Sequence, residues 1–409
     1  MNSFIFHSDS PLLTSSNDGT STSFRLKNCS SGPIRASWIG ENGAINSLLT
    51  LASNRDTVFH TSSTHPWLIE YKNRKNLNFQ FYPTHISSID VTESGPIMSV
   101  FDVPRWSPLS GYGIVDVAKA LEVPDIGATV TDAEASNAAA LNLIKASSAW
   151  SSGYTGKGVT VAILDAGIAA HASIQECIAD EYDAVLDSKK ISLDPNYYLN
   201  HALGVACIVA GCHELQTQVP KVIGVAPEAK LMNIRITAHI KDYKTTADAA
   251  MARGIKWATD NGAKILCIPV QHDASKVSQL IIDALTYAKK KGVISVVIGG
   301  NYSRWGACGP ALTAKQDLCI AVGNIDLSTR VPCITSNVPG EVPQPWVMAS
   351  SSGIFPTADG GVTDYKDDWG TSFAGPYVAG VAALLVQKYP ATDPEEIIQR
   401  ITNSASFSA

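Results

Sequence analysis

A serine able to act as a nucleophile lies at the start of a long run of small and apolar residues. Ser372 belongs to the stretch GTSFAGP at 370–376, which leads into YVAGVAALL. This composition predicts a buried helix, and a helix N-terminus offers backbone N–H groups and a positive dipole end. A serine hydroxyl needs a base to take its proton, and an oxyanion formed beside it needs donors already in place. The pattern therefore indicates acyl-transfer chemistry at Ser372.

An acid and a histidine earlier in the chain could supply that base. Asp165 closes the apolar run VTVAIL, at the carboxyl end of a predicted strand. His201 opens HALGVACIVAG, whose small and β-branched residues predict a helix packed in the interior. Taken alone, Asp165 could bind a ligand and His201 could be a core histidine. A histidine at the head of such a helix could also meet the aspartate of the neighbouring strand.

A second oxyanion donor follows another apolar run. Asn301 comes directly after GVISVVIGG at 292–300. Its side-chain amide could point at the developing negative charge. The alternative is a turn residue after a strand.

The elements that must position these residues begin near residue 158. Apolar runs alternate with amphipathic stretches, which predicts βαβ units and a parallel sheet covered by helices on both faces. In such an α/β fold, ligands and catalytic groups collect beyond the carboxyl ends of the strands. The predicted strands are VTVAILDAG, KLMNIRI, AKILCIPV, GVISVVIGG and LCIAVGNID, and the predicted helices are TADAAMARGIKWATDNG and SQLIIDALTYAKKKG.

Three segments resemble the subtilisin-like serine proteases, or subtilases. They are GKGVTVAILDAGI, GVAPEAKLMNIRI and GTSFAGPYVAGVAALL, and with the order Asp, His, Ser the resemblance covers about residues 140–409. It implies a subtilisin-like fold and a serine endopeptidase acting on protein or peptide substrates. Asp165 would orient and stabilise the imidazolium, His201 would be general base and then acid, and Ser372 would be acylated. Asn301 would serve the oxyanion.

Two motifs depart from the family pattern. HALGVAC at 201–207 replaces the usual HGTHVAG, and Pro269-Val270-Gln271-His272 replaces the usual SLGG. The resemblance implies that Pro269, Val270 and Gln271, with Gly299 and Gly300, bind substrate. A proline cannot donate to a strand ladder, and larger side chains narrow a pocket. We therefore expect a restricted or unusual substrate.

A third departure concerns chain order. The stretch SGYGIVDVAKAL at 110–121 resembles the GxGxVDAxxA turn and helix that usually ends a subtilisin-like domain. Here it precedes the Asp165 segment, which suggests a circular permutation in which residues 109–123 are the former C-terminal helix. Such a change is tolerated where domain termini lie close together. The alternative is an unrelated linker helix.

The first quarter of the chain has a different character. Residues 1–20 are rich in Ser, Thr, Asn and Asp and predict a flexible tail. Residues 21–93 hold short β-branched and aromatic stretches separated by Gly, Asn and Ser, which predicts a small all-β sandwich. Residues 94–108 contain two prolines and a glycine and predict a linker to a peptidase domain at 109–409.

The predicted sandwich resembles the β domain of the von Hippel–Lindau tumour suppressor. The matching residues are Asn28, Ser30, Ser31, Trp38, Asn42, Gly43, His60, Thr61, His65, Pro66 and Trp67. The resemblance implies peptide binding through Thr61, His65 and Trp67, so the domain would bind a second protein, recruit substrate or cover the cleft. The alternative is that Trp67 and Trp38 fill the sandwich core.

Composition and charge exclude some other classes. The 409-residue chain has a net charge of −6 and no basic run, which argues against a nucleic-acid surface. We see no secretory signal and no apolar run able to span a bilayer, so we expect a soluble protein without membrane contact. Its location stays unknown, with the cytoplasm favoured over an unrecognised export route.

Cysteines and acids do not define a metal site. The spacing of the eight cysteines matches no zinc pattern, and Cys207 and Cys267 lie in apolar runs. Cys308 and Cys319 could pair in an oxidising compartment. We expect no cofactor. An acidic loop could bind calcium, but a solvated loop without an ion is favoured. That loop holds Asp359, Asp364, Asp367 and Asp368.

Two other functions use the same residues. A peptidyl transferase would resolve the acyl-enzyme with an amine instead of water, on the same triad. A catalytically weak protease-like binding protein would keep the fold without the reaction. The intact set of Asp165, His201, Ser372 and Asn301 favours an active peptidase over the binding protein.

Overall fold

The structure, a computed structural model, divides into two compact units, Met1–Val103 and Pro104–Ala409. It describes the chain except residues 1–5, 8–20, 29–31, 40–43, 54, 63–66, 72–78, 82–85, 93–94, 101–105, 133, 194–198, 212–221, 238–242, 272–274, 341, 352–353, 357–364, 368–369 and 407–409. For residues 6–7, 21–25, 27, 39, 47–48, 56–62, 71, 79–81, 86–92, 95–100, 199, 243–246, 354–356 and 365–367 it describes the backbone alone.

The first unit consists of two β-sheets with strand orders β1-β7-β6-β3-β4 and β5-β2-β8-β9. The strands are β1 Phe6–His7, β2 Ser21–Asn28, β3 Ile34–Ile39, β4 Ile45–Leu51, β5 Asp56–Ser62, β6 Trp67–Tyr71, β7 Phe79–Phe81, β8 Ile86–Thr92 and β9 Gly95–Val100. Leu26 of one sheet and Ile34, Trp67 and Ile69 of the other are buried. The prediction of a small all-β domain is confirmed.

Two strands correct the predicted boundaries of this domain. β1 lies in residues 1–20, which we predicted as a tail, and β9 lies in residues 94–108, which we predicted as a linker. β9 is the edge strand of its sheet, and a proline is tolerated at an edge because no second neighbour needs its N–H. The Gly and Pro of this segment are therefore compatible with a strand.

The second unit is built on seven parallel strands in the order β11-β12-β10-β13-β14-β15-β16. These are β10 Thr160–Asp165, β11 Ile178–Asp183, β12 Lys230–Arg235, β13 Ile265–Ile268, β14 Ile294–Ile298, β15 Ile320–Ile325 and β16 Trp346–Ser350. The helices are α1 Val117–Ala120, α2 Ala138–Leu143, α3 Ala146–Ser151, α4 Leu199–Ala210, α5 Tyr243–Asp260, α6 Gln279–Lys290, α7 Thr371–Lys388 and α8 Pro394–Ser404. Short 3-10 helices occupy Gln175–Cys177 and Gly309–Gln316, and β17 Ile354–Pro356 pairs with β18 Tyr365–Asp367.

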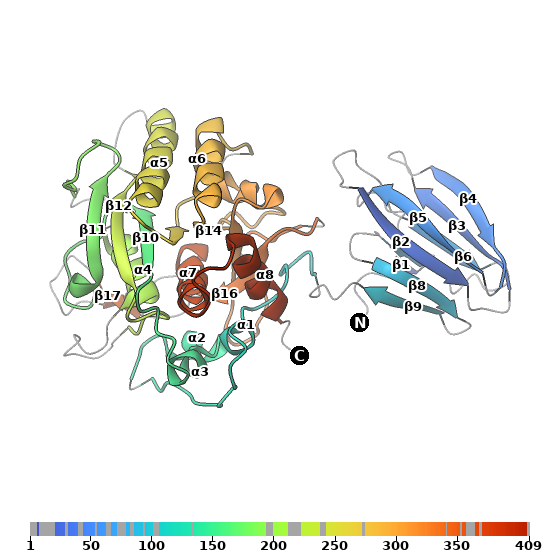
Figure 1. The fold of residues 1–409 in the computed structure, drawn as a ribbon, viewed down its shortest axis with the longest axis horizontal. Coiled ribbons are helices and arrows are strands. Elements are labelled where there is room, and N and C mark those ends of the chain that lie inside the picture. The colour runs from blue at the N-terminus through green and yellow to red at the C-terminus, as the bar shows by residue number, and fades with distance from the viewer. Residues whose placement is uncertain are drawn as a thin grey trace. The chain divides into compact units, whose positions relative to one another are not determined.

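Successive residues of each parallel strand enter two different cores. Val161 and Ile163 of β10 pack in the core that contains α4 and α7, whereas Ala162 and Leu164 pack in the core that contains α5 and α6 (Figure 1). Burial on both faces explains why these strands are continuous apolar runs in the sequence. The prediction of a parallel sheet with helices on both faces is confirmed. Within the described ranges, no helix is both long enough and apolar enough to cross a membrane.

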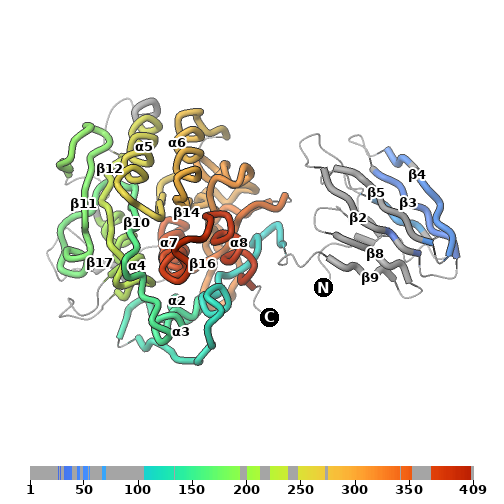
Figure 2. The backbone as a smooth tube through the Cα atoms, in the orientation of Figure 1, coloured from blue at the N-terminus to red at the C-terminus, as the bar shows by residue number. Residues whose placement is uncertain are grey.

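The segment that precedes the first parallel strand lies at the β16 edge of this sheet. Ile114 pairs in parallel with Met348 and in antiparallel with Ser406. The helix that follows, α1, packs near α8 (Figure 1 and Figure 2). Close by, Arg400 Nη1 lies 3.2 Å from Glu122 Oε1. Residues at the start and at the end of the unit therefore pack together.

Among the described cysteines of this unit, five are buried and none forms a disulfide. Cys308 and Cys319, which we considered as a pair, form no disulfide. Cys319 Sγ lies 3.3 Å from Thr313 Oγ1, and Cys308 Sγ lies 3.6 Å from the carbonyl oxygen of Gly299. Burial raises the pKa of the Cys207 and Cys267 thiols, which is the behaviour of inert core residues.

Candidate active site

The predicted acid lies at the carboxyl edge of the sheet. Asp165 is the last residue of β10, and it is buried with 3% of its surface exposed. Its Oδ1 accepts the N–H of Ala166 at 2.6 Å, which fixes the plane of the carboxylate. Gly167 follows with a φ of +97°, a conformation that favours glycine and turns the chain away from the strand.

The predicted base faces this carboxylate. His201 belongs to the first turn of α4, and its Nδ1 lies 2.7 Å from Asp165 Oδ2. An ionised carboxylate can only accept hydrogen bonds, so Nδ1 carries the proton and Nε2 is the nitrogen able to take one. The imidazole also meets the ring of Phe373 edge to face, with centroids 5.3 Å apart. This contact brings the imidazole to the first turn of α7.

The predicted nucleophile lies in that same turn. Ser372 is the second residue of α7, is 9% exposed, and donates its hydroxyl to the carbonyl oxygen of Pro269 at 3.1 Å. Its backbone N–H is among the first four of the helix, which have no partner within the helix. The N–H of Thr371 on one side goes to Asn301 Oδ1, and that of Phe373 on the other goes to the carbonyl of Gly370.

The orientation of the Asn301 amide follows from its neighbour. Asn301 Oδ1 accepts both the backbone N–H of Thr371, at 2.8 Å, and its hydroxyl, at 2.9 Å. A backbone N–H can only donate, so this atom is the oxygen, and Nδ2 is left to donate on the other side. Gly370, which precedes Thr371, has a φ of +118°, and a Cβ at this position would lie 3.2 Å from Asn301 Nδ2.

Sequence reasoning missed the role of Thr371. The residue was visible in the motif beside Ser372, but nothing in the sequence tied it to an amide 70 positions away. A threonine at the start of a helix, next to a nucleophile, is the available signal. Its hydroxyl and N–H together orient Asn301.

The predicted substrate segment joins the nucleophile to the oxyanion donor. Pro269, Val270 and Gln271 follow β13, and Val270 and Gln271 are half-buried. Pro269 accepts from Ser372, while Gln271 Oε1 accepts the backbone N–H of Asn301 at 2.6 Å. The position of His272 lies outside the described residues.

The two predicted glycines lie at the end of the neighbouring strand β14. A Cβ at Gly299 would lie 2.3 Å from the indole of Trp346, and one at Gly300 would lie 2.3 Å from Cys308 Sγ. Gly300 also has a φ of +110°. Both positions therefore require glycine, and both present bare backbone at the edge of the sheet.

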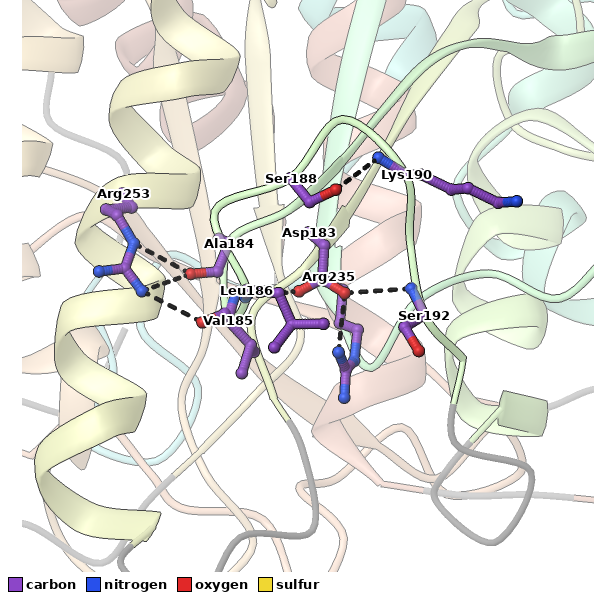
Figure 3. Close-up of polar contacts among 9 residues, drawn as sticks. All are labelled: Asp183, Ala184, Val185, Leu186, Ser188, Lys190, Ser192, Arg235 and Arg253. Carbon is purple, nitrogen blue, oxygen red and sulfur yellow. Dashed lines mark hydrogen bonds and ion pairs between the residues drawn. The ribbon is translucent and has the colours of Figure 1, made fainter.

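A buried ion pair between the ends of β11 and β12, the two strands beyond β10 on one side of the sheet, was not predicted. Asp183 ends β11, is fully buried, and pairs with Arg235 at the end of β12 at 2.7 Å. Its carboxylate also accepts the backbone N–H groups of Val185, Leu186 and Ser192 (Figure 3). Arg235 ends the apolar run KLMNIR, but Asp183 ends the polar stretch IADEYD, so no sequence pattern marks this pair.

The ion pair anchors the loop that covers the turn after Asp165. Arg253 of α5 donates to the carbonyl oxygen of Ala184 at 2.7 Å and holds the other side of the loop (Figure 3). Further along the loop, the side chain of Leu193 lies so near Gly167 that a Cβ added to this glycine would be 2.7 Å from it. The loop therefore packs on the segment that follows the carboxylate of Asp165.

Replacing Arg235 with methionine is expected to destabilise the protein strongly. The change leaves the carboxylate of Asp183 buried without its cation, and removing one partner of a buried pair costs about 3–5 kcal/mol of unfolding free energy. Urea denaturation followed by fluorescence measures this. The matched control is Lys256→Met, which removes an exposed partner of Asp260 and should change the midpoint little. Equal midpoints for the two variants would contradict the assignment.

Of the three residues predicted to bind a peptide in the β unit, Trp67 is the one whose side chain the structure describes. Trp67 is 1% exposed and is one of the largest fully buried side chains. This favours the alternative in which it fills the core, because a buried indole has no face to offer a ligand. Thr61 lies in β5 with its side chain undescribed, and His65 lies outside the described residues.

In the described parts of the chain, no group of His, Cys, Asp and Glu side chains is placed to hold a metal ion. Of the acidic loop, Asp359, Asp364 and Asp368 lie outside the described residues. His171 is buried with 4% exposed, and burial lowers the pKa of its imidazole. A place so soon after the Asp165 motif would suggest a surface loop, but the structure puts this histidine in the interior.

A parallel sheet that carries an Asp–His pair at its carboxyl edge, beside a serine on a helix N-terminus, is typical of serine hydrolases. The sequence model of the Subtilase family, peptidase S8, matches residues 156–409, and the chain belongs to this family. The prediction of a subtilisin-like serine protease is thereby confirmed at the level of the family.

Individual relatives are distant. Subtilisin DY of Bacillus licheniformis is 29% identical over 265 residues, which cover 64% of this chain and 89% of that protein. Alkaline elastase YaB of Bacillus sp. (strain YaB) is 30% identical over 266 residues, which cover 65% of this chain and 64% of that protein. Among solved structures, a cold adapted subtilisin-like serine proteinase is 24% identical with a TM-score of 0.49, covering 60% of this chain and 81% of that chain.

Proposed function

We propose that this protein is a serine endopeptidase that hydrolyses peptide bonds through Asp165, His201 and Ser372. The observation that carries the proposal is the 2.7 Å contact between Asp165 Oδ2 and His201 Nδ1, with the imidazole held against Phe373. This contact leaves the proton-accepting nitrogen of the ring beside the turn that holds Ser372. Family membership supports the same reaction.

In the proposed first step, His201 Nε2 takes the proton of the Ser372 hydroxyl, which turns from the Pro269 carbonyl toward the imidazole. The oxygen attacks the substrate carbonyl carbon, and the π electrons of that carbonyl move to its oxygen. The imidazolium then gives its proton to the leaving amine as the C–N bond breaks. Water, deprotonated by the same nitrogen, hydrolyses the acyl-serine. These steps use groups of the chain itself.

The negative charge that forms in each half-reaction needs fixed donors. Asn301 Nδ2 is aimed by the two bonds that Thr371 makes to Oδ1, and the Ser372 N–H is aimed by the helix. Donors that are oriented before the reaction stabilise the charge without reorganising. We propose these two groups as the oxyanion hole, with the loss of one such donor lowering kcat by about 10²–10³-fold.

The test is labelling of the full-length protein with a fluorophosphonate probe. Such a probe modifies a serine only when a base activates it, so peptide mapping should find the adduct on Ser372 and on no other serine. Hydrolysis of peptides should yield free carboxylates, identified by product masses in the presence of an added amine. An unlabelled protein would reject the proposed activity.

We also propose that the N-terminal β unit recognises a protein, either recruiting substrate or covering the cleft. Its separation as a compact unit, Met1–Val103, supports an independent role, and its likeness to a peptide-binding domain suggests which role. With Trp67 in the core, the contact surface would lie elsewhere on the unit. Its partner would be a second protein or the substrate itself.

Deleting residues 1–103 is expected to alter cleavage of a protein substrate and to leave a short fluorogenic peptide unaffected. The reason is that a recruiting module acts on contacts that a short peptide lacks. Comparing kcat/KM on both substrates, before and after deletion, measures this. Equal changes on both substrates, with an unchanged labelled fraction of Ser372, would reject recruitment, so the labelled fraction is the control.

We propose, finally, that residues 109–123 are the permuted C-terminal element of the domain. The mutual hydrogen bonds between Ile114 and Ser406, both 2.9 Å, support this order of segments, as does the ion pair between Glu122 and Arg400. An unrelated linker helix would have no reason to complete the sheet edge beside β16.

A further inference from the structure

Two adjacent strands separate at the carboxyl edge of the sheet, and one side chain joins them again. β13 and β14 are paired up to Ile268 and Val297. Beyond that point the chain continues to Gln271 on one side and to Asn301 on the other. The Gln271 side chain crosses between them, because its Oε1 accepts the Asn301 N–H at 2.6 Å. Ligands of open parallel sheets bind outside the carboxyl ends of the strands, and this is the edge at which Gln271 lies.

The order of groups along this edge tells which part of a substrate would meet Gln271. The strand order is β10, β13, β14, so His201 lies over the β10 side and Asn301 over the β14 side, with Ser372 contacting Pro269 between them. The leaving nitrogen must approach His201 to receive its proton. The residue that supplies the scissile carbonyl therefore extends away from His201, toward the opening that Gln271 crosses.

On the β14 side, the two residues before Asn301 are Gly299 and Gly300, which have no side chains. The positions where their Cβ atoms would lie are taken up by Trp346 and Cys308. The Gly299 N–H is bonded to Val322 O at 2.8 Å and the Gly299 carbonyl accepts from Asn337 Nδ2 at 3.1 Å, so this backbone is fixed. Gln271 is half-buried, and its side chain can move, whereas the backbone of Gly299 is held by these bonds.

We propose that Gln271 determines specificity by restricting the residue before the scissile bond to a small side chain, such as glycine, alanine or serine. A larger side chain has to displace the Gln271 amide from the Asn301 N–H. That displacement breaks a hydrogen bond and loosens the backbone of the residue whose side chain serves the oxyanion. The substrates are thus protein segments with a small residue at this position, an inference that rests on the proposed endopeptidase function.

The experiment uses the full-length protein and fluorogenic peptides that differ only in alanine or phenylalanine before the scissile amide. Active-site concentration comes from fluorophosphonate labelling, so kcat/KM refers to folded, reactive enzyme. The variants are Gln271→Gly, which removes both volume and hydrogen bond, and Gln271→Leu, which keeps the volume without the acceptor. Gln271→Ala replaces the glycine variant if that variant does not label, and Gln279→Ala on the exposed face of α6 is the matched control.

The wild type is expected to prefer alanine, and Gln271→Gly is expected to raise the phenylalanine-to-alanine ratio of kcat/KM at least about tenfold. Gln279→Ala should keep the low wild-type ratio, and Gln271→Leu, which keeps the volume but has no hydrogen bond to break, should give a ratio between those of the wild type and Gln271→Gly. A wild type that accepts phenylalanine as well as alanine, or a ratio unchanged in Gln271→Gly, would overturn the inference. A leucine variant with the wild-type ratio would overturn it too, because the hydrogen bond would then play no part. Absence of labelling in the wild type would instead reject the proposed function itself.

Discussion

Replacing Ser372 with alanine is expected to lower kcat by about 10⁶-fold, the size of the effect found when the serine of the subtilisin triad is removed. The variant loses the atom that forms the acyl bond but keeps the oxyanion donors. Binding contacts also remain, so KM should change only a few-fold. Active-site labelling and steady-state hydrolysis of a short peptide measure the two quantities.

The alanine side chain fits the site without strain, because Ser372 lies at the buried start of α7 and the change only removes an oxygen. Folding should therefore be intact, and thermal melting checks this. Ser328→Ala, at an exposed turn, is the control that should keep full activity. A Ser372→Ala protein that retains even a hundredth of the wild-type rate would show that another group is the nucleophile.

Asp165→Asn is expected to lower kcat by about 10⁴-fold while the fold is retained. The asparagine amide can donate to Nδ1 of His201, which places the ring proton on Nε2. That nitrogen then cannot accept the proton of Ser372, so the base is lost although every atom keeps its place. Single-turnover acylation of a peptide ester measures the step directly.

A surface carboxylate supplies the comparison for this substitution. Asp326 accepts hydrogen bonds from Ser328 and Thr329 in a turn, and these bonds lower the pKa of its carboxyl to about 2. Asp326→Asn should leave acylation unchanged, because the turn lies in another part of the sheet edge and contacts no triad residue. If Asp165→Asn and Asp326→Asn acylate at equal rates, Asp165 has no role in orienting the imidazole.

The architecture of the second unit was predictable because it depends on patterns local in sequence. The runs that form β10, β13 and β14 are apolar on both faces, and the stretches that form α5 and α6 carry an amphipathic period. Boundaries in the β unit were less predictable. β9 was not predicted because glycine and proline, here Gly95 and Pro96, usually mark turns. They are tolerated in this strand because it lies at the edge of the sheet, and that position depends on the whole sheet.

The candidate site divides in the same way. Asp165, His201, Ser372 and Asn301 each stand beside a recognisable element, so their types and order were enough to name them. Contacts that depend on side-chain direction were not predictable. Gln271 was expected only to narrow a pocket, and no pattern indicates that its amide reaches a backbone N–H 30 residues away. The burial of Trp67 likewise depends on which face of β6 packs inward.

The pairing of Ile114 with Met348 and Ser406 has a consequence for how the nascent chain matures on the ribosome. The early segment emerges first, but both of its partners are translated more than 200 residues later. At about 5–20 residues per second, it waits on the order of ten seconds or longer with its edge incomplete. Ser372 is also made late, after both other members of the proposed triad. On the proposed mechanism, the nascent chain therefore lacks its nucleophile until most of the domain has been synthesised.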